Sequence, residues 1–599
     1  MKKNKTAPYV IPLALLLTVV PLIVRLHTFQ TNLAQFDWYM TDNEGADFFL
    51  YYKSVAVTII AAVMCLLLLY RYKAKQKEFK LSYQFLPVAA YAVLTLLSSI
   101  FSEYRYFSFH GVSQIFETVW VLLGYCVIAF YAYQFVNTIE DVDSIMFWLT
   151  VGLAVMLVIG ILQAVGHDLF GTDFGKMLIT GWTTDLDKID LVFEKGRVFL
   201  TLYNPNFVAS YFALMIPVEI ALFIKNKSLI YRVVYAVMLA ASLVCLLASG
   251  NRSGIVAFAV TIVLTLILLY KYIFRAWKFV VPAVVVAALI MGAYISQNDF
   301  IIEKFVKLFS APDQAEDAVS EIITGDEDVK VTYLGQVFHV SYESDENGYV
   351  AINIVDDQNE QIANVLDQET STYNVTDERY PGLGLQPVRL GDYIGVNVKV
   401  DGRDWYFVKG EDGTYYYFNV YGRLDKINNA PRVAVNFLEK KFEERGTIWS
   451  KTIPMLKDCI FFGSGADTYT VTYPQDDYVD KVYDGTTTAI DQKPHCFYLQ
   501  VATQSGIPAL LAVLAFYIWY FISGFKIYRK ASYQDGLEIM GAGFYLAAFT
   551  YMVISFLNDS TVAVAPIYWI MMGMGISINE ILKKRNEKTA DPQHKAGKG

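Results

Sequence analysis

The stretch FFLYYKSVAVTIIAAVMCLLLLY, residues 48–70, is apolar along almost its whole length. It is close to the ~20 residues that a helix needs to cross ~30 Å of hydrocarbon. Similar stretches recur at about residues 9–26, 83–101, 115–135, 145–166, 206–224, 230–248, 254–274, 279–296, 497–524, 537–556 and 562–580. In lipid every backbone polar group needs a partner within the chain, so these runs should be helices. The sequence therefore predicts an all-α polytopic membrane protein with about 12 transmembrane helices.

The composition and the first residues agree with this class. Charged residues make up 18% of the 599, against about 25% in soluble proteins. The start, Met1-Lys2-Lys3 before an apolar run, is also compatible with a signal peptide. However, no small-residue cleavage site follows, and Arg25 and His27 end a run that is long enough to span. We therefore interpret it as the first membrane helix.

The short turns between the predicted helices indicate the orientation. Lys and Arg gather in alternate turns, at 71–80, 225–232, 271–278 and 526–530, and again after residue 582. Because cytoplasmic loops are rich in Lys and Arg, these turns and both termini should be cytoplasmic. The long polar interval at 298–496 then lies outside the cytoplasm. The acidic excess behind the net charge of −9 sits largely in that interval, and no basic patch suggests a nucleic-acid partner.

The chain divides into six expected parts. These are transmembrane helices 1–9 at 1–297, an amphipathic outer-loop segment at 298–327, a β-rich insert at 328–432, a helical outer-loop segment at 433–496, transmembrane helices 10–12 at 497–582, and a cytoplasmic tail at 583–599.

The β-rich insert is predicted from alternating runs. Residues 394–400 and 415–420 alternate apolar and polar side chains, and Asp401-Gly402 and Asp412-Gly413 supply turn pairs. A small sandwich or barrel fits this pattern. The insert is either a structural addition or a module that binds carbohydrate or a partner.

Four charged or titratable residues stand at helix boundaries on the outer side. They are Arg197, Arg252, Arg445 and His495. A single Arg at a helix end is usually an anchor whose charge reaches the headgroups. Ionisable residues at membrane depth are nevertheless costly and commonly functional, and random boundary charges would fall on both faces. Their shared side favours one converging site.

Arg and His suit a particular chemistry. Arginine binds phosphate oxygens through a bidentate fork, and several together can stabilise the charge of a leaving pyrophosphate. Histidine can accept a proton from a hydroxyl near neutral pH. These residues fit the displacement of a lipid pyrophosphate by an acceptor hydroxyl, although they do not single it out.

Other classes have weaker support. No His, Cys or Glu group has metal-ligand spacing, and the sequence has neither a P-loop nor a GxSxG elbow. A transporter or flippase would show related halves and a polar midplane, and neither is evident. A receptor with the insert as its ligand module would have only a short cytoplasmic tail. Cys459 and Cys496 both lie outside, where a disulfide is compatible with the sequence but not required by it.

The motifs in these regions resemble those of the O-antigen ligase / Wzy polymerase superfamily, bacterial membrane glycosyltransferases that use undecaprenyl-pyrophosphate-linked glycans. Five stretches carry the resemblance: Gly196-Arg197-Val198-Phe199 with Asn204-Pro205-Asn206, Ser249-Gly250-Asn251-Arg252-Ser253-Gly254, Arg445-Gly446-Thr447-Ile448-Trp449, Gly463-Ser464-Gly465 with Tyr469, and Pro494-His495 through Leu499-Gln500 to Gly506-Ile507-Pro508. Their order and the large loop before the tenth helix also look like the family.

The resemblance implies an inverting, metal-independent transferase, without a cofactor, in the bacterial cytoplasmic membrane. Its donor would be an undecaprenyl-pyrophosphate-linked glycan and its acceptor a glycan, lipid or protein. Arg197, Arg252 and Arg445 would hold the pyrophosphate, and His495 would activate the acceptor hydroxyl. The substrate-binding candidates are Asn204, Asn206, Tyr498 and Gln500. A ligase is the first expectation, a repeat-unit polymerase the alternative, and a transporter of lipid-linked glycan a further one.

Two features depart from the family. Cys496 stands where the family usually has Asn after the loop histidine. The β-rich insert is not a usual family part, so it is the region where an acceptor preference of this chain would arise.

Overall fold

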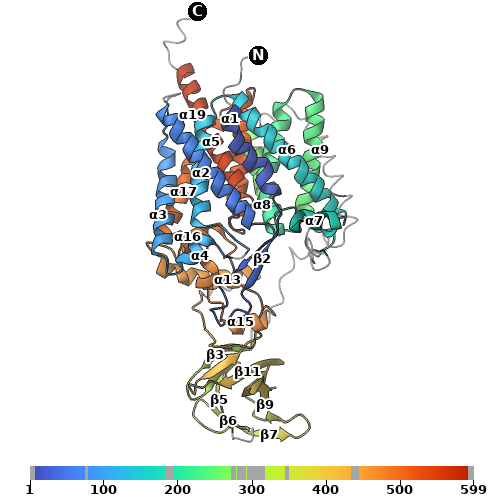
Figure 1. The fold of residues 1–599 in the computed structure, drawn as a ribbon, viewed down its shortest axis with the longest axis vertical. Helices are drawn as coiled ribbons and strands as arrows, with labels where there is room; N and C mark the ends of the chain where they lie inside the picture. Colours follow the sequence, from blue (N-terminus) through green and yellow to red (C-terminus); the bar gives the residue numbers. More distant parts are fainter. Residues whose placement is uncertain are drawn as a thin grey trace, which may run out of the picture.

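A computed structural model describes residues 7–74, 79–112, 114–181, 186, 194–270, 278, 292, 318–344, 350–433 and 444–590. Figure 1 shows a helical bundle with a β-strand region at one end. The start of α1 (Ala7–Ala14) and the end of α19 (Ala565–Ala590) lie at the other end. The structure is thus mostly helical. The strands of the described residues lie in a hairpin within residues 27–47 and in the region at 319–425.

The helices follow the apolar runs of the sequence. Between α1 and α19 they are α2 (Tyr51–Lys73), α3 (Leu86–Phe101), α4 (Arg105–His110), α5 (Val119–Phe135), α6 (Ile139–Ala164), α7 (Asp173–Thr180), α8 (Pro205–Lys225), α9 (Leu229–Ala248), a helix at Arg252–Tyr270, α13 (Glu444–Met455), α14 (Tyr469–Thr472), α15 (Tyr478–Tyr483), α16 (Phe497–Ser505), α17 (Ile507–Tyr528) and α18 (Gly536–Ile554).

Within the described residues, eight helices are long and apolar enough to cross a membrane. They are Tyr51–Lys73, Tyr83–Phe101, Ile139–Ala164, Pro205–Lys225, Leu229–Ala248, Arg252–Tyr270, Ile507–Tyr528 and Gly536–Ile554. Pro8–Leu22 and Val119–Phe135 are shorter apolar helices, and the predicted ninth span at 279–296 lies outside the described residues. A multi-pass membrane protein is confirmed, whereas the expected 12 spans are not.

The predicted tenth span is wrong as one continuous helix. It splits into α16 and α17 at Gly506, whose φ is +95°. A side chain there would be strained, and its Cβ would lie 2.8 Å from the carbonyl oxygen of Phe461. Eight of the nine α16 residues are buried, so α16 packs inside the protein instead of facing lipid. Hydropathy alone does not separate these two situations.

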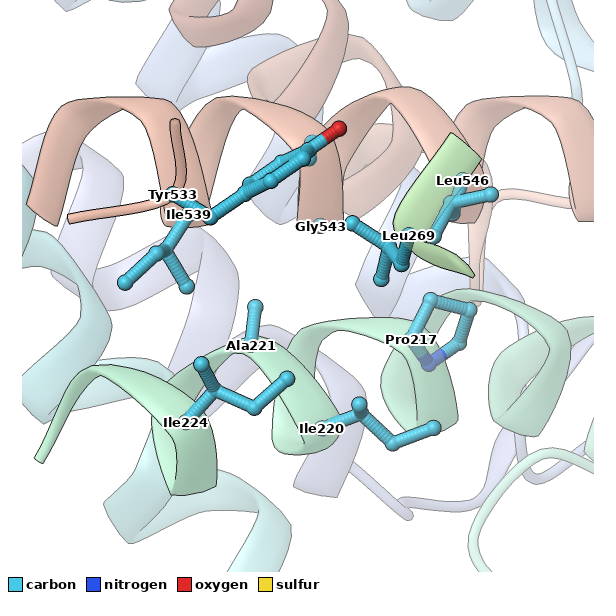
Figure 2. Close-up of a pocket in the computed structure, with 10 residues that line it drawn as sticks. Pro217, Ile220, Ala221, Ile224, Leu269, Tyr533, Ile539, Gly543 and Leu546 are labelled. Atoms are coloured by element: carbon cyan, nitrogen blue, oxygen red, sulfur yellow. The ribbon is translucent and has the colours of Figure 1, made fainter. Parts of the chain in front are cut away.

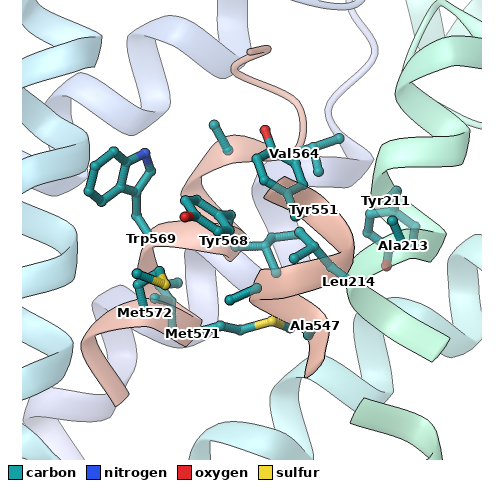
Figure 3. Packing of buried hydrophobic residues seen from close by; sticks show 14 of the residues in the cluster. Tyr211, Ala213, Leu214, Ala547, Tyr551, Val564, Tyr568, Trp569, Met571 and Met572 are labelled. Atoms are coloured by element: carbon teal, nitrogen blue, oxygen red, sulfur yellow. The ribbon is translucent and has the colours of Figure 1, made fainter. Parts of the chain in front are cut away.

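The core of the bundle is formed by α8, α18, α19 and α5. Figure 3 shows Tyr551 of α18 stacked on Tyr568 of α19, with ring centroids 4.4 Å apart. Small residues allow close contact: a Cβ on Gly573 would lie 2.0 Å from the carbonyl oxygen of Ala129 on α5. Membrane helices usually pack through small side chains, which let their backbones approach closely. The hydrophobic effect does not drive helices together in a membrane, because lipid is as apolar as their side chains.

A small apolar cavity lies between α8 and α18. Figure 2 shows Pro217 and Ala221 of α8 below Gly543 of α18. A Cβ on Gly543 would meet that of Ala221 at 2.5 Å. The cavity has a volume of about 20 Å³ and its lining offers little polar surface, so it is a packing defect rather than a candidate site.

The β region contains two antiparallel sheets. One has the order β3-β4-β5-β6 and the other the order β13-β12-β11-β10-β9-β8-β7. Their strands are β3 (Val319–Thr324), β4 (Val329–Tyr333), β5 (Gln336–Ser344), β6 (Val350–Asp356), β7 (Asn364–Asp367), β8 (Thr372–Val375), β9 (Gly384–Leu390), β10 (Tyr393–Val400), β11 (Arg403–Lys409), β12 (Tyr415–Phe418) and β13 (Leu424–Asp425). Alternate side chains, among them Phe338, Val398 and Trp405, fill one buried core.

The strands begin earlier than the expected boundary at residue 328. β3 pairs with β4, although it lies in the segment expected to be an amphipathic part of the outer loop. Val319 and Ile322 are buried in the β core, and this burial accounts for the apolar residues in the stretch. Residues 298–317 of the expected segment lie outside the described residues.

The β region is held by the loop after the first apolar helix. That loop carries a two-stranded hairpin, β1 (His27–Gln30) and β2 (Glu44–Asp47). Between its strands, the carbonyl oxygens of Ala34 and Phe36 accept hydrogen bonds from Nη1 of Arg423, at 2.7 and 3.1 Å. Nδ2 of Asn419 donates to the carbonyl oxygen of Asp37 at 2.9 Å. The β region is therefore docked on the bundle by polar contacts.

Candidate functional site

His495 lies at the start of α16, at the end of the bundle that carries the β region. Its Nδ1 contacts Oδ2 of Asp559 at 3.0 Å. The other carboxylate oxygen, Oδ1, accepts a hydrogen bond from the backbone N–H of Cys496 at 3.0 Å. The Asp559 side chain is 3% exposed and the His495 side chain 37%. A buried carboxylate thus orients a histidine that solvent and substrate can reach.

The pairing determines which ring nitrogen faces a substrate. When Nδ1 carries the proton and donates a hydrogen bond to Asp559, Nε2 is the basic nitrogen. His495 also has a φ of +51°, in the left-handed region that few residues other than Gly adopt, although Asn, Asp and His do so more often than the rest. Cys496, in place of the family's usual Asn, contributes its backbone N–H to Asp559. The histidine is therefore fixed by the backbone and by Asp559, whatever side chain follows it.

His495 and Asp559 open onto a cavity of about 110 Å³. The lining residues are Gln114, Ile115, Tyr203, Asn204, Asn206, Phe207, Ile490, Asp491, Gln492, Lys493, His495, Asn558 and Asp559. Three residues predicted from the sequence, Asn204, Asn206 and His495, meet here. Most of the lining is polar, as expected of a site for a hydroxyl-rich or charged ligand.

The Asn204-Pro205-Asn206 motif forms the start of α8. Oδ1 of Asn204 caps the helix by accepting from the backbone N–H of Asn206 at 2.8 Å, and Pro205 takes the first helical position. Nδ2 of Asn558 donates to the carbonyl oxygen of Asn206 at 3.1 Å. The motif is therefore tied to the residue next to Asp559.

Arg252 and Arg197 meet the same network through the 249–254 turn. Ser253 donates through Oγ to Oδ1 of Asn558 at 3.3 Å, and Asn251 donates to the side chain of Asn206. Arg252, between them, begins the helix at Arg252–Tyr270. Arg197 donates through Nε to the carbonyl oxygen of Ser249 at 3.3 Å and pairs with Glu194. Both arginines thus lie beside the start of α8.

Arg445 belongs to α13, a helix that contacts the segment before His495 through Trp449. Arg445 lies one turn before Trp449, and residues four apart share a helix face. Nε1 of Trp449 donates to the carbonyl oxygen of Pro494 at 2.7 Å. The face of α13 that carries Arg445 is therefore fastened to the segment that presents His495.

Gln500 and Tyr498 are not among the residues that line the cavity. Gln500 is buried, accepts from the backbone N–H of Ser560 at 2.9 Å and donates to Glu117 at 3.2 Å. Tyr498 donates to the carbonyl oxygen of Met552 at 2.9 Å. Gln500 thus holds the connection between α18 and α19, which carries Asp559, and Tyr498 holds the end of α18, while neither lines the cavity.

A buried ion pair supports the cavity floor. Nζ of Lys493 lies 3.6 Å from Oε2 of Glu117 and donates to the carbonyl oxygen of Ser560 at 2.6 Å. Oε1 of Glu117 also accepts from Ser560 and Tyr125, both at 2.7 Å. Such a fully hydrogen-bonded pair resists displacement, because removing one partner leaves a buried charge. The pair holds the 558–560 turn in place.

Residues 413–514 match the family described as O-antigen ligase. The matched segment contains the Arg445 and Trp449 motif, the glycine turn at 463–465 and His495. The resemblance to the O-antigen ligase / Wzy polymerase superfamily is thereby confirmed. A membrane enzyme of the ligase or polymerase kind follows from this relation. No match is found among the curated proteins or among the solved structures.

The glycine turn of the O-antigen ligase segment has a structural role. Ser464 and Gly465 donate their backbone N–H groups to the carbonyl oxygens of Thr503 and Gln504, at 2.8 and 2.9 Å. A Cβ on Gly463 would lie 2.2 Å from the carbonyl carbon of Gln504. The turn therefore holds the end of α16, the helix that begins after His495.

A second cavity of about 100 Å³ lies within the O-antigen ligase segment and shares Asp491 and His495 with the first. Its charged lining includes Lys451, Asp480, Lys481 and Asp484. Burial raises the pKa of Asp491 above its usual range, while the nearby Lys481 lowers it. His495 can thus face ligands in two adjoining cavities.

Sequence reasoning missed Asp559, Glu117, Asp491 and Lys493. Asp559 lies in the short connection between the predicted spans at 537–556 and 562–580, and Glu117 lies at the edge of the span at 115–135. The rule that singled out Arg252, that charge at a membrane boundary is costly, applies equally to these carboxylates. Within the described residues no group of three or more His, Cys, Asp or Glu forms a metal site, and Cys459 and Cys496 are free.

Proposed function

We propose that this protein transfers a glycan from an undecaprenyl-pyrophosphate carrier to an acceptor hydroxyl, on the outer face of the cytoplasmic membrane. The observation that carries the proposal is the His495–Asp559 pair at a polar cavity, within and beside the segment that matches the O-antigen ligase family. The proposed orientation, with both termini cytoplasmic, rests on the Lys and Arg content of the short turns.

His495 acts as the general base. Its Nε2 takes the proton of the acceptor hydroxyl while the hydroxyl oxygen attacks the anomeric carbon. The bond from that carbon to the pyrophosphate oxygen breaks, and its electron pair leaves with the pyrophosphate, so the anomeric configuration inverts. Asp559 stabilises the imidazolium that forms and holds the ring in the required tautomer. The proton ends on His495 and is then released to solvent.

Arg197, Arg252 and Arg445 bind the pyrophosphate in this proposal. Arg197 and Arg252 flank the start of α8, and Arg445 lies on the α13 face fastened to Pro494. Fixed guanidinium groups around a leaving pyrophosphate stabilise its charge without reorganising as the bond breaks. Asn204 and Asn206, which line the same cavity, position the donor's first sugar.

The two cavities divide the substrates between them. The cavity bordered by Asn204 and Asn206 takes the donor, although none of the three arginines is among its lining residues. The cavity bordered by Lys451 and Asp480 takes the acceptor, because hydroxyl groups hydrogen-bond well to paired charges. In an inverting displacement the acceptor and the leaving group lie on opposite sides of the anomeric carbon, and a histidine shared by both cavities stands between them.

A transfer assay tests the proposal. Purified protein, a lipid-linked oligosaccharide and candidate acceptors are incubated, and glycosidic product is quantified for the wild type, His495→Ala and Asp559→Asn. We expect both variants to lose about 10²–10⁴-fold in rate, since each removes general-base function. His110→Ala serves as control, because His110 lies on α4 and stacks on Tyr106 instead of lining either cavity.

Each contrary result has a clear meaning. Undiminished transfer by well-expressed His495→Ala overturns the assigned role. Movement of lipid-linked glycan across a liposome membrane without any glycosidic product favours a transporter. Product length separates the two enzymes: a single transfer to a non-identical acceptor indicates a ligase, and serial extension of the donor's own glycan indicates a polymerase.

A further inference from the structure

Another polar cavity lies at the end of the bundle that carries the end of α19, away from His495 (Figure 1). Its volume is about 390 Å³, larger than either cavity at His495. Arg71 from the last turn of α2, Lys80 from the turn before α3, and Lys584 from α19 line it, together with Asn137, Ser577 and Glu580. None of these residues takes part in the proposed transfer.

Two of the three cations are held by neutral oxygen atoms. Arg71 is 5% exposed, donates through Nη1 to the carbonyl oxygen of Gln134 at 3.0 Å, and lies 4.5 Å from the centre of the Phe135 ring. Nζ of Lys80 donates to the carbonyl oxygens of Val136 and Tyr133, at 2.8 and 3.2 Å, and to Ser577 at 3.0 Å. These contacts fix the positions of the charges but do not neutralise them.

The cavity lining is therefore electropositive. Glu580 is its carboxylate among the described residues, and it already accepts a hydrogen bond from Tyr133 at 2.8 Å. Burial, and then the positive charge of Arg71, lower the pKa of Lys80 to about 8, although Glu580 and Asp141 act in the opposite direction and Lys584 adds to the lowering. Electrostatic repulsion between cations is strong in a partly dehydrated cavity. An anion bound between them replaces this repulsion with attraction and forms charge-assisted hydrogen bonds.

The surroundings point to a lipid as the source of that anion. Arg71 ends a predicted span, and Leu66, Leu69, Tyr70 and Tyr72 on the same part of α2 are exposed. Exposed apolar residues on a membrane helix face acyl chains, and a Tyr near a helix end marks the headgroup level. Basic cavities between membrane helices at this level are suited to phosphate headgroups.

We propose that the cavity lined by Arg71, Lys80 and Lys584 is a binding site for the phosphate group of an anionic phospholipid. The phosphate oxygens accept hydrogen bonds from the two fixed cations and from Lys584, and the acyl chains lie along α2. The site is independent of the proposed transfer chemistry, since it lies at the opposite end of the bundle and shares no residue with it.

Lipid retention tests the site. Protein is purified with phosphatidylglycerol or with phosphatidylcholine, and bound lipid is counted by native mass spectrometry. We expect phosphatidylglycerol to be retained in preference and Lys584→Glu to weaken its retention by about fivefold or more, the effect of roughly one charge at a membrane surface. Lys583→Glu is the matched control, because it makes the same charge change on a neighbouring, 71% exposed α19 side chain that does not line the cavity.

A second arm separates the lipid from a soluble ligand. Inorganic phosphate is added to delipidated protein and the melting temperature is followed. Phosphatidylglycerol retention that falls in Lys584→Glu but not in Lys583→Glu supports the proposal. Equal retention of the two lipids, or equal loss in both variants, overturns it. A phosphate-dependent rise in melting temperature that Lys584→Glu abolishes, without lipid preference, overturns the lipid source and assigns the cavity to a soluble phosphate.

Discussion

At the scale of single residues, the candidate site rests on a pairing between positions far apart in the chain. His495 lies just before α16 and Asp559 lies in the connection between α18 and α19, and their contact at 3.0 Å depends on the 558–560 turn. Glu117, Lys493 and Gln500 hold that turn through buried hydrogen bonds. The position of His495 therefore depends on buried polar groups, of which Lys493 also lines the cavity and Glu117 does not.

Asp467 supplies a residue-scale prediction about pH. It is fully buried at a φ of +58°, and its Oδ2 accepts from the backbone N–H of Val112 at 2.9 Å. Burial raises the pKa of Asp467 well above its usual range, against the opposing effects of that hydrogen bond and of Lys493. In the unfolded chain the carboxyl titrates near ~3.9. The stability that protonated Asp467 contributes is therefore complete below ~4 and declines as the pH rises.

Asp467→Asn should remove this decline, because Asn stays neutral and tolerates the same backbone conformation. We expect the stability of the variant to increase relative to that of the wild type as the pH rises from ~4 to ~8. Thermal denaturation in detergent at several pH values measures the difference. Asp392→Asn, on an exposed turn of the β region, is the control. A difference that stays constant over this range would contradict the prediction.

At the scale of elements, close backbone contacts fix the helices that carry the site. Gly506 breaks the apolar run into α16 and α17, and Gly463 lets the turn at 463–465 lie against the end of α16. Hydrophobic length predicts that a segment is helical, but not whether it faces lipid or packs inside the protein. Eight of the nine α16 residues are buried, which explains why a run read as one span is two helices with different surroundings.

Gly463→Ala tests the contact between the turn and α16. The added Cβ would lie 2.2 Å from the carbonyl carbon of Gln504 and 2.4 Å from the N atom of Ser505, so one of the two backbones must move. We expect a loss of about 1–3 kcal/mol in stability and reduced transfer, since α16 begins beside His495. Gly171→Ala is the control, because nothing lies within 4 Å of its Cβ. Equal melting temperatures for the two variants would show that the contact is dispensable.

At the scale of the whole molecule, the β region and the bundle have separate cores joined by polar contacts. Trp405 and Phe338 lie in the β core, whereas Tyr551 and Tyr568 lie in that of the bundle. α15 contributes Tyr478 to the β core and thus links the β region to the loop that ends at His495. α15 also contributes Asp480 and Lys481 to the lining of the candidate acceptor cavity. The β region thus contacts a helix of that cavity, although no residue of its strands lines the cavity.

Arg423→Ala should loosen the β region from the bundle. The guanidinium donates to the carbonyl oxygens of Ala34, Phe36 and Tyr39 and pairs with Asp37. The loss of even one charged hydrogen bond, worth about 1.5–3 kcal/mol, corresponds to a change of about tenfold or more, so the variant should be cleaved by protease in the 31–43 loop at least about tenfold faster. Mapping the cleavage sites by mass spectrometry checks this. Arg379→Ala, whose partners Asp356 and Asp377 both lie within the β region, should leave the rate unchanged; equal rates for both variants would argue against docking through Arg423.

Much of this organisation was predictable from sequence. The helical, multi-pass class follows from the apolar runs, and the outer β region from the alternation at 394–400 and 415–420. The resemblance to the O-antigen ligase family was predictable from ordered motifs around Arg445 and His495, and the matched segment at 413–514 confirms it. The expected roles of Arg197, Arg252, Arg445 and His495 stay predictions for the transfer assay to decide.

The sequence by itself determined which segments are helical in a membrane and which form strands outside it, because backbone hydrogen bonding in lipid leaves a long apolar run no other structure. Only the tertiary structure decided that Asp559 orients His495, that Gln500 supports the 558–560 turn instead of facing a ligand, and that Arg71, Lys80 and Lys584 share one cavity. These are contacts between residues distant in the chain. Hydropathy records the average environment of a segment, whereas a pairing depends on how the helices pack against one another.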